Sequence, residues 1–94
     1  MRQTIVPDHP GRLLKEELDE RGLSVNALAL ALRVPSTRIH EIVHERRSIT
    51  PDTSARLGRY FGASPGYWRG IQIQYDAARV DLDRILAEVL ASVS

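Results

Sequence analysis

The sequence predicts an all-α fold, and three observations support this class. Apolar residues recur at steps of three and four over most of the chain, as they do along the buried face of a helix. No segment shows the alternation of apolar and polar residues that a half-buried strand needs. Capping residues, prolines and glycines separate the apolar stretches. We therefore expect one all-α domain of five helices with a helical extension at the C-terminus.

The composition limits the class of protein. Of the 94 residues, 43% are hydrophobic and 27% are charged, as in a soluble globular domain with a modest core. There is no cysteine, which excludes disulfides and thiolate zinc sites. The longest apolar run, at residues 27–32, is too short to cross a bilayer, and the N-terminus lacks a signal-peptide core. We expect a cytoplasmic protein with no membrane contact and no cofactor.

Positive charge is concentrated in the middle of the chain. The net charge is only +1, but residues 33–69 carry seven arginines against three acidic residues. The segments before and after, residues 1–32 and 70–94, are both net negative. Attraction to phosphate depends on local potential, so this distribution favours nucleic-acid binding by the middle segment.

Residues 1–9 are expected to form an extended arm, in which His9 has no role beyond the loop. Pro10 suits the first turn of a helix, and Gly22 suits the left-handed residue that ends one. Between them, one side of the helix carries Leu13, Leu14 and Leu18. We expect this first helix to pack over the two helices that follow.

The next two helices are short and are joined by a tight turn. Ser24 caps the first of them, and the second occupies residues 36–45 after a break at residues 33–35. Each has a buried stripe at helical spacing, made of Leu28, Ala29 and Leu32 in the first and of Ile39, Ile42 and Val43 in the second. This is the helix-turn-helix arrangement, in which the second helix is presented to the major groove of DNA.

The outward face of that second helix is polar. At about 100° per residue, Thr37, Glu41 and His44 point directly away from the buried stripe. Guanidinium groups match phosphate and guanine, and short polar side chains let a helix approach base edges. A solvated face beside a chance basic pair is the plain alternative. The residues on this face, at its edges and directly after it are Ser36, Thr37, Arg38, His40, Glu41, His44, Arg46 and Arg47.

The same helix contains a zinc-protease pattern. Residues 40–44 read HEIVH, in which two histidines and a glutamate have the spacing of such a site. A catalytic zinc needs a third protein ligand and a substrate cleft, yet the only other histidine is His9, upstream. We therefore expect neither a metal site nor an enzyme, and a zinc hydrolase stays as the enzyme-class alternative.

Two further helices complete the domain. Residues 50–51 supply a cap and a first-turn proline for a fourth helix that ends at Gly62. Residues 64–65 are expected to start a fifth helix in the same way. The fourth helix should partly bury Ala55, Leu57, Tyr60 and Phe61.

The last third of the chain has an apolar stripe suited to self-association. Its residues recur at alternating steps of three and four, a seam over three heptads if one helix carries them all. Asp81 offers the alternative of capping a separate last helix. The first three stripe residues fit the core of the domain equally well. The residues predicted to contact a second subunit are Trp68, Ile71, Tyr75, Leu82, Ile85 and Val89.

Two stretches and a short pattern after them resemble one family. HPGRLLKEEL and RIHEIVHERRSITPDTSARLGRYFGASPGYW, followed by Gln72, Tyr75 and Asp76, are similar to the HigA (VapI-like) antitoxins of the lambda-repressor-like, or XRE, helix-turn-helix family. The resemblance covers about two thirds of the chain and implies a lambda-repressor-like core at residues 10–76 with an extension at residues 77–94. It also implies a homodimer that represses its own operon at a palindromic double-stranded operator and neutralises a HigB-like toxin that cleaves RNA. The apolar residues beyond Val80 then have two alternative partners, a second subunit or this toxin.

The resemblance also implies particular DNA contacts. The implied base readers are Ser36, Thr37 and Glu41, flanked by Arg38 and His40. The implied backbone contacts are His44, Arg46 and Arg47, with the amides near Ser24 and Asn26 at the start of the preceding helix.

Three positions depart from the pattern of this family. Arg33 stands where the turn usually has glycine, so it must adopt a left-handed conformation or change the turn. Glu45 also replaces a common glycine and brings an acid close to the phosphates. Glu41 would be repelled by the DNA backbone unless it accepts a hydrogen bond from cytosine. Glu41 and Glu45 therefore leave a protein-interaction module with weakened DNA binding as one alternative function. A solitary XRE-type regulator without a toxin is the alternative within DNA binding.

Overall fold

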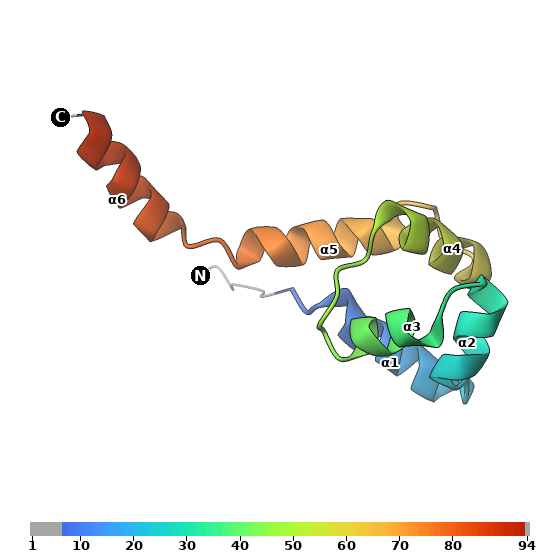
Figure 1. Cartoon of the computed structure of the whole chain (residues 1–94). Helices are drawn as coiled ribbons and strands as arrows, with labels where there is room; N and C mark the ends of the chain where they lie inside the picture. The colour runs from blue at the N-terminus through green and yellow to red at the C-terminus, as the bar shows by residue number, and fades with distance from the viewer. Residues whose placement is uncertain (1–6, 94) are drawn as a thin grey trace, which may run out of the picture.

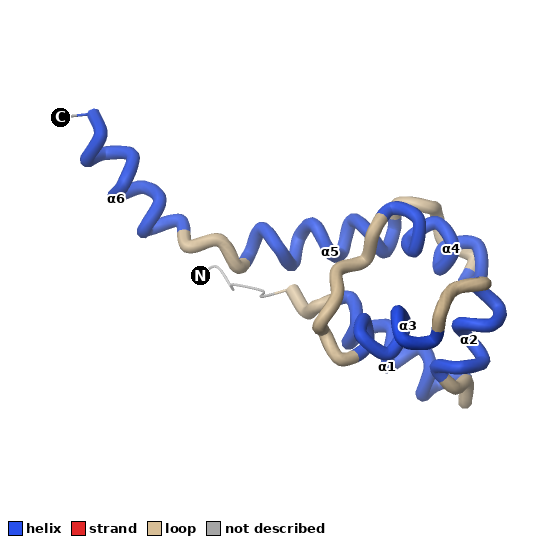
Figure 2. Tube along the Cα trace, viewed as in Figure 1, coloured by secondary structure: helices blue, strands red, loops and turns tan. Residues whose placement is uncertain are grey.

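A computed structural model describes residues 7–93, which form six helices and no strand (Figures 1 and 2). Five helices make up a body, and the sixth extends away from it (Figure 1). The predicted all-α class with a helical extension is thereby confirmed. Most of the predicted arm, residues 1–9, lies outside the described residues. The helices are α1 (Pro10–Arg21), α2 (Val25–Leu32), α3 (Ser36–Val43), α4 (Pro51–Phe61), α5 (Tyr67–Ala78) and α6 (Leu82–Val93).

The five-helix body encloses one apolar core. Helix α2 packs against α3 and α4, α1 packs against α3 and α5, and α4 also packs against α5. Burying one of the larger side chains stabilises the fold by about 1.5–3 kcal/mol relative to leaving it exposed. The stripes predicted for α2 and α3 are therefore the surfaces that hold these two helices together. The buried apolar residues are Leu14, Leu18, Leu28, Ala29, Leu32, Ile39, Ile42, Val43, Ile49, Leu57 and Trp68.

The start of α1 depends on His9, for which the sequence predicts no role. The side chain is 5% exposed, and its Nδ1 accepts a hydrogen bond from the Gly11 amide N–H at 2.9 Å. Its ring also meets the edge of Tyr75, with ring centroids 4.9 Å apart. A Cβ atom at Gly11 would overlap the carbonyl oxygen of Ile42. The start of α1 can therefore approach the end of α3 only because residue 11 is glycine.

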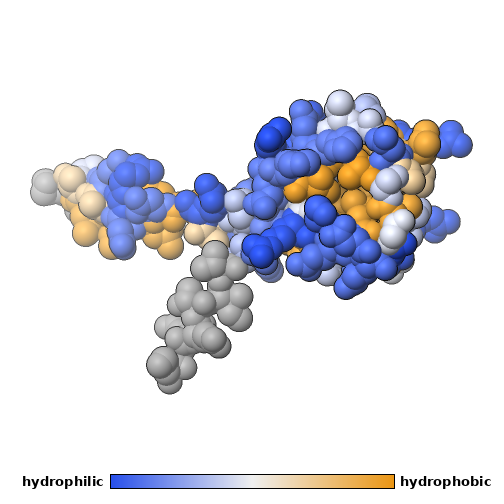
Figure 3. Space-filling view, turned by 90° about the horizontal axis from the view of Figure 1, so that it is seen from below, coloured by the Kyte–Doolittle hydropathy of each residue, from blue (hydrophilic) through white to orange (hydrophobic). Residues whose placement is uncertain are grey.

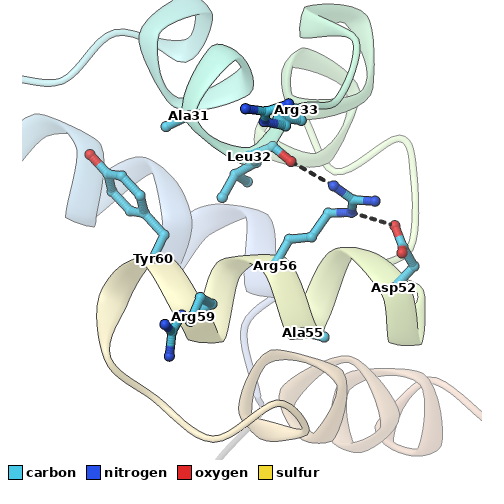
Figure 4. Close-up of a pocket in the computed structure, with 8 residues that line it drawn as sticks. All are labelled: Ala31, Leu32, Arg33, Asp52, Ala55, Arg56, Arg59 and Tyr60. Atoms are coloured by element: carbon cyan, nitrogen blue, oxygen red, sulfur yellow. Dashed lines mark hydrogen bonds and ion pairs between the residues drawn. The ribbon is translucent and has the colours of Figure 1, made fainter.

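The turn between α2 and α3 has the left-handed residue that the sequence suggests. Arg33 has φ 60° and ψ 46°, a conformation that costs a residue other than glycine about 1–2 kcal/mol. Arg56 of α4 supports this turn, because its Nη1 donates to the Leu32 carbonyl oxygen at 2.8 Å (Figure 4). The Nε of the same guanidinium donates to Asp52 at 2.9 Å (Figure 4). Helix α4 thus fixes the end of α2 and with it the angle at which α3 starts.

Helix α4 buries only part of the predicted face. Leu57 is buried and Phe61 is half-buried against the core, as predicted, whereas Ala55 is exposed and Tyr60 is 42% exposed, so the predicted burial is wrong for these two. The buried positions are Leu57 and the small polar residues Thr53 and Ser54, which lie one turn before it. The prediction assumed that the apolar residues of α4 are buried. In the structure, α5 packs against small residues of α4, which allow the two helices to approach closely.

Helix α5 starts at Tyr67, two residues beyond the predicted cap and proline, and it has no side-chain cap of its own. Ser54 of α4 replaces the cap: its hydroxyl donates to the Pro65 carbonyl oxygen at 2.6 Å and accepts from the Arg69 amide at 2.9 Å. The prediction of a local cap at Ser64 is therefore wrong. The start of α5 is fixed by a contact between helices, which a local rule does not see.

Helix α6 is separate from α5, as in the second of the two predicted arrangements. Asp81 Oδ1 accepts from the Arg84 amide at 3.0 Å and so caps α6. The helix stands clear of the body (Figure 1) and exposes an apolar stripe made of Leu82, Ile85, Leu86, Val89 and Leu90. None of the helices within residues 7–93 is both long enough and apolar enough to cross a bilayer. The predicted boundary between core and extension, after residue 76, stays a prediction.

Candidate nucleic-acid interface

Helix α3 presents the polar face that the sequence places there. Its three apolar residues are buried, and α3 packs against α1 and α2. No large apolar side chain lies on the opposite side, so a base edge can come close to it. The residues on that side are exposed or half-buried, and they are Ser36, Thr37, Arg38, His40, Glu41 and His44.

Two ion pairs lie on or beside this face. Arg47 Nε donates to Glu41 Oε1 at 2.7 Å, and a guanidinium nitrogen of Arg38 lies 3.6 Å from the carboxylate of Asp52. The positive charge beside Glu41 reduces the repulsion that this carboxylate would exert on a phosphate. The sequence does not predict either pair, because each joins α3 to a residue of the following loop or helix.

The loop between α3 and α4 carries Arg46 and Arg47, and α5 holds it in place. The Ile49 amide donates to Gln72 Oε1 at 2.9 Å, and Arg69 Nη1 donates to the Ile49 carbonyl oxygen at 2.7 Å. Gln72 is only 1% exposed, so water does not compete with this contact. Sequence reasoning misses Arg69 and includes Gln72 only through the resemblance. The signal for Gln72 is a polar residue in line with the apolar positions of α5.

Helix α2 brings further predicted residues to the same side. The Ser24 hydroxyl accepts from the Ala27 amide at 3.0 Å, which confirms that Ser24 caps this helix. Asn26 is exposed and lines a shallow hollow of about 310 Å³ together with Ser36 of α3. The starts of α2 and α3 therefore border the same hollow, whose other lining residues are the apolar Ala29, Leu30 and Val34.

His40 and His44 lie next to each other on α3, with their rings stacked and their centroids 6.5 Å apart. His44 Nδ1 donates to the His40 carbonyl oxygen at 2.8 Å. Within residues 7–93, no group of three His, Cys, Asp or Glu side chains is placed to hold a metal ion. The remaining histidine, His9, is buried at the start of α1.

The residues predicted for a dimer contact divide into two groups. Trp68 is 3% exposed within the core of its own chain, and Ile71 packs against the same core. Tyr75 is half-buried beside His9. By contrast, α6 leaves one apolar side uncovered, which the space-filling view shows opposite a hydrophilic side (Figure 3). The second group, on α6, is 69% (Leu82), 37% (Ile85) and 53% (Val89) exposed.

A hollow lies between the end of α2 and α4 (Figure 4). It has a volume of about 650 Å³. Its edge adjoins the outward face of α3 through Asp52, which pairs with Arg38. None of the predicted DNA contacts lines it. The lining residues are Ala31, Leu32, Arg33, Asp52, Ala55, Arg56, Arg59 and Tyr60.

The α2–α3 pair, its polar outward face and the arginines that follow it define a DNA-binding protein of the helix-turn-helix class. Residues 14–68 match the family described as helix-turn-helix. The chain belongs to this family, in its XRE-type branch.

Individual proteins similar to this chain include antitoxins of the HigA family. The chain is 45% identical over 87 residues to virulence-associated protein I of Dichelobacter nodosus, a match that covers 92% of this chain and 81% of that protein. It is also similar in structure to an addiction module antidote protein of the HigA family from Coxiella burnetii, with a TM-score of 0.80, 36% identity, and 96% and 98% of the two chains covered. A third match is the Pseudomonas aeruginosa antitoxin HigA with the higBA promoter, with a TM-score of 0.74, 44% identity, and 77% and 79% of the two chains covered.

Proposed function

We propose that this chain is the antitoxin of a HigB–HigA type module, which binds its own operator as a homodimer and neutralises an RNA-cleaving toxin. The observation that carries this proposal is the polar outward face of α3. It lies on the scaffold shared with a 44% identical HigA protein whose structure includes its promoter. Such a repressor acts in the cytoplasm, where its operon lies.

The proposed DNA contacts follow from the positions of the side chains. Residues at the start and centre of α3 face the bases, and residues at its end face the backbone. The start of α2 supplies backbone amides to a neighbouring phosphate. The proposed base readers are Ser36, Thr37 and Glu41, with Arg38 and His40 beside them. The proposed backbone contacts are Ser24, Asn26, His44, Arg46 and Arg47.

Helix α6 is the proposed dimer contact. A single recognition helix reaches few bases, whereas two helices about 34 Å apart read successive turns of the major groove and bind jointly. The exposed side chains of Leu82, Ile85 and Val89 lie on one stripe that a second α6 would cover. Trp68 is buried in its own subunit, which favours a core role for it over a dimer contact.

A fluorescence-anisotropy titration tests operator binding. The full chain is titrated against duplex DNA from its own upstream promoter and against a scrambled duplex, at two salt concentrations. We expect tighter binding to the promoter than to the scrambled duplex, saturation at two chains per operator, and weaker binding at higher salt. Equal binding to both duplexes would contradict the proposal and favour a protein-interaction module.

Co-expression tests the antitoxin role. The product of the gene next to this one is expressed alone and together with the chain, and cell growth and RNA integrity are measured. We expect growth arrest with RNA cleavage from the neighbouring product alone, and recovery when both proteins are present. A neighbouring product that has no effect on growth would leave a solitary regulator as the function.

A further inference from the structure

A polar pocket lies where the start of α1, the loop after α3 and the end of α5 meet. Its volume is about 240 Å³. It combines residues from the predicted DNA-binding loop with residues that lie outside the helix-turn-helix, including Arg79 at the C-terminal cap of α5. The lining residues are His9, Glu45, Arg46, Arg47, Ser48, Gln72, Tyr75, Asp76 and Arg79.

Two guanidinium groups that are unpaired within the described chain make this pocket a candidate for an anion. Three guanidinium groups line it, against the carboxylates of Glu45 and Asp76. Asp76 Oδ1 accepts a hydrogen bond from Gln72 Nε2 at 3.0 Å and keeps its charge, and Arg47 is paired with Glu41. Within residues 7–93, neither Arg46 nor Arg79 takes part in an ion pair. Their donors are therefore available to an incoming group.

Arg79 is held in place from one side only. Its guanidinium carbon lies 5.3 Å from the centre of the Tyr75 ring, a cation–π distance. Tyr75 in turn meets the buried ring of His9. A stacked guanidinium keeps its N–H groups free at the edge, so this arrangement orients Arg79 without using its hydrogen-bond donors.

The pocket also borders the DNA-facing side of the molecule. Arg47 lines it, and the Nε of Arg47 donates to Glu41 on the outward face of α3. Arg46 and Ser48 belong to the loop that Gln72 and Arg69 anchor through Ile49. A nucleic-acid backbone that follows α3 to its end therefore passes the mouth of this pocket.

We propose that this pocket receives a phosphate of the operator backbone and that Arg79 is a phosphate-contacting residue outside the helix-turn-helix. This inference rests on the proposed operator binding. It extends the DNA-contacting surface from α2 and α3 to the end of α5. Arg79 contributes the same binding free energy to every DNA sequence, because a phosphate contact positions the protein and does not read bases.

Salt dependence of binding distinguishes Arg79 from other arginines of the C-terminal region. The full chain, Arg79→Ala and Arg84→Ala are titrated by fluorescence anisotropy against the promoter duplex and a scrambled duplex over a series of KCl concentrations. Arg84→Ala is the matched control, because it removes the same charge from α6, where Arg84 pairs with Glu88 at 2.9 Å. We expect Arg79→Ala to lower the slope of log K against log salt by about one for each bound chain, hence by about two for the dimer, and to weaken both duplexes by roughly the same factor. The control should leave the slope unchanged.

A second variant separates charge from folding. Arg79→Lys keeps the charge and should restore most of the salt slope, and thermal unfolding by circular dichroism checks that all variants fold. A slope for Arg79→Ala equal to that of the control would overturn the inference. A wild-type chain that shows no salt-dependent binding would instead remove the proposed function itself, so the two failures are distinct.

Discussion

The neutral form of a single histidine holds the start of α1. His9 Nδ1 accepts a hydrogen bond from the Gly11 amide N–H, so protonation of Nδ1 would break this contact. Burial lowers the pKa of His9 below its ordinary value of 6.5, with Arg79 acting in the same direction and Glu45 and Asp76 against it. Below pH 6.5 the unfolded chain therefore binds more protons at His9 than the folded chain. The stability from this residue is complete above that pH and is lost as the pH falls through the lowered pKa.

Replacing His9 by asparagine tests this dependence. Asparagine caps a helix but does not titrate, so His9→Asn should lose less stability between about pH 7.5 and about pH 5.5 than the wild type. The measurement is the free energy of unfolding in urea at both pH values. The exposed His40 and His44 are present in both chains and cancel in the comparison. An equal loss in both chains would show that His9 is not the group responsible.

Gly11 gives a second prediction at this scale. The new methyl group in Gly11→Ala would overlap the Ile42 carbonyl oxygen, so α1 must move away from α3. We expect the variant to lose about 1–3 kcal/mol of unfolding free energy, measured by urea denaturation. Gly70→Ala is the control, since a Cβ there has no neighbour within 4 Å. That control should gain about 0.5–1 kcal/mol from helix propensity, and a similar loss in both variants would contradict the close-approach argument.

Single residues were predictable from the sequence where their partner is local. Ser24 and Thr50 cap the helices that directly follow them, and Gly22 and Gly62 adopt the left-handed conformation that ends a helix. The contact of Gln72 is not predictable in this way, because its partner Ile49 is 23 residues away in the sequence. No rule based on neighbouring residues connects such pairs, so the polar contacts that hold the DNA-binding loop had to come from the structure.

At the scale of an element, we expect the ion pair formed by Glu41 and Arg47 to affect how α3 meets DNA. Removing the carboxylate in Glu41→Ala takes a negative charge from the groove face and releases Arg47. We expect affinity for a scrambled duplex to rise roughly two- to fivefold, and the preference for the promoter duplex to fall, in the same anisotropy titration. Glu20→Ala, at an exposed acidic position of α1, controls for net charge. Weaker binding of Glu41→Ala to both duplexes would instead mean that Glu41 holds Arg47 in position for DNA.

Whole helices were predicted more reliably than their faces. The apolar spacing placed all five helices of the body, yet α4 buries Ser54 and exposes Tyr60. Helix α4 contains apolar residues on more than one side, so spacing alone does not select the side that meets α5. Ser54 is buried because the neighbouring helix α5 packs against it, and Ser54 also caps the start of α5. The local sequence therefore determines where a helix forms, and packing against other helices determines which face of it is buried.

For the whole molecule, α6 is the element whose role can be tested without disturbing the core. Leu86 and Val89 are 57% and 53% exposed, so the double change Leu86→Glu with Val89→Glu should leave thermal unfolding of the body unchanged. We expect the dimer to become a monomer in light scattering and operator affinity to fall roughly a hundredfold, because joint binding is lost. Arg84→Ala on the polar side of α6 is the control. A variant that remains dimeric would move the contact to another surface.

Under the proposed autorepression by a dimer paired through α6, the separation of α6 from the body has a consequence for how the gene responds to its own product. A lone chain already has a complete core and a formed recognition helix, so pairing adds valency and not folding. Below the dissociation constant of the pair, the concentration of dimers rises with the square of the concentration of chains. Occupancy of the operator then stays low until enough product has accumulated and afterwards rises steeply. The proposed repressor would then switch off its own synthesis above a threshold concentration, and the strength of the proposed α6 contact would set that threshold.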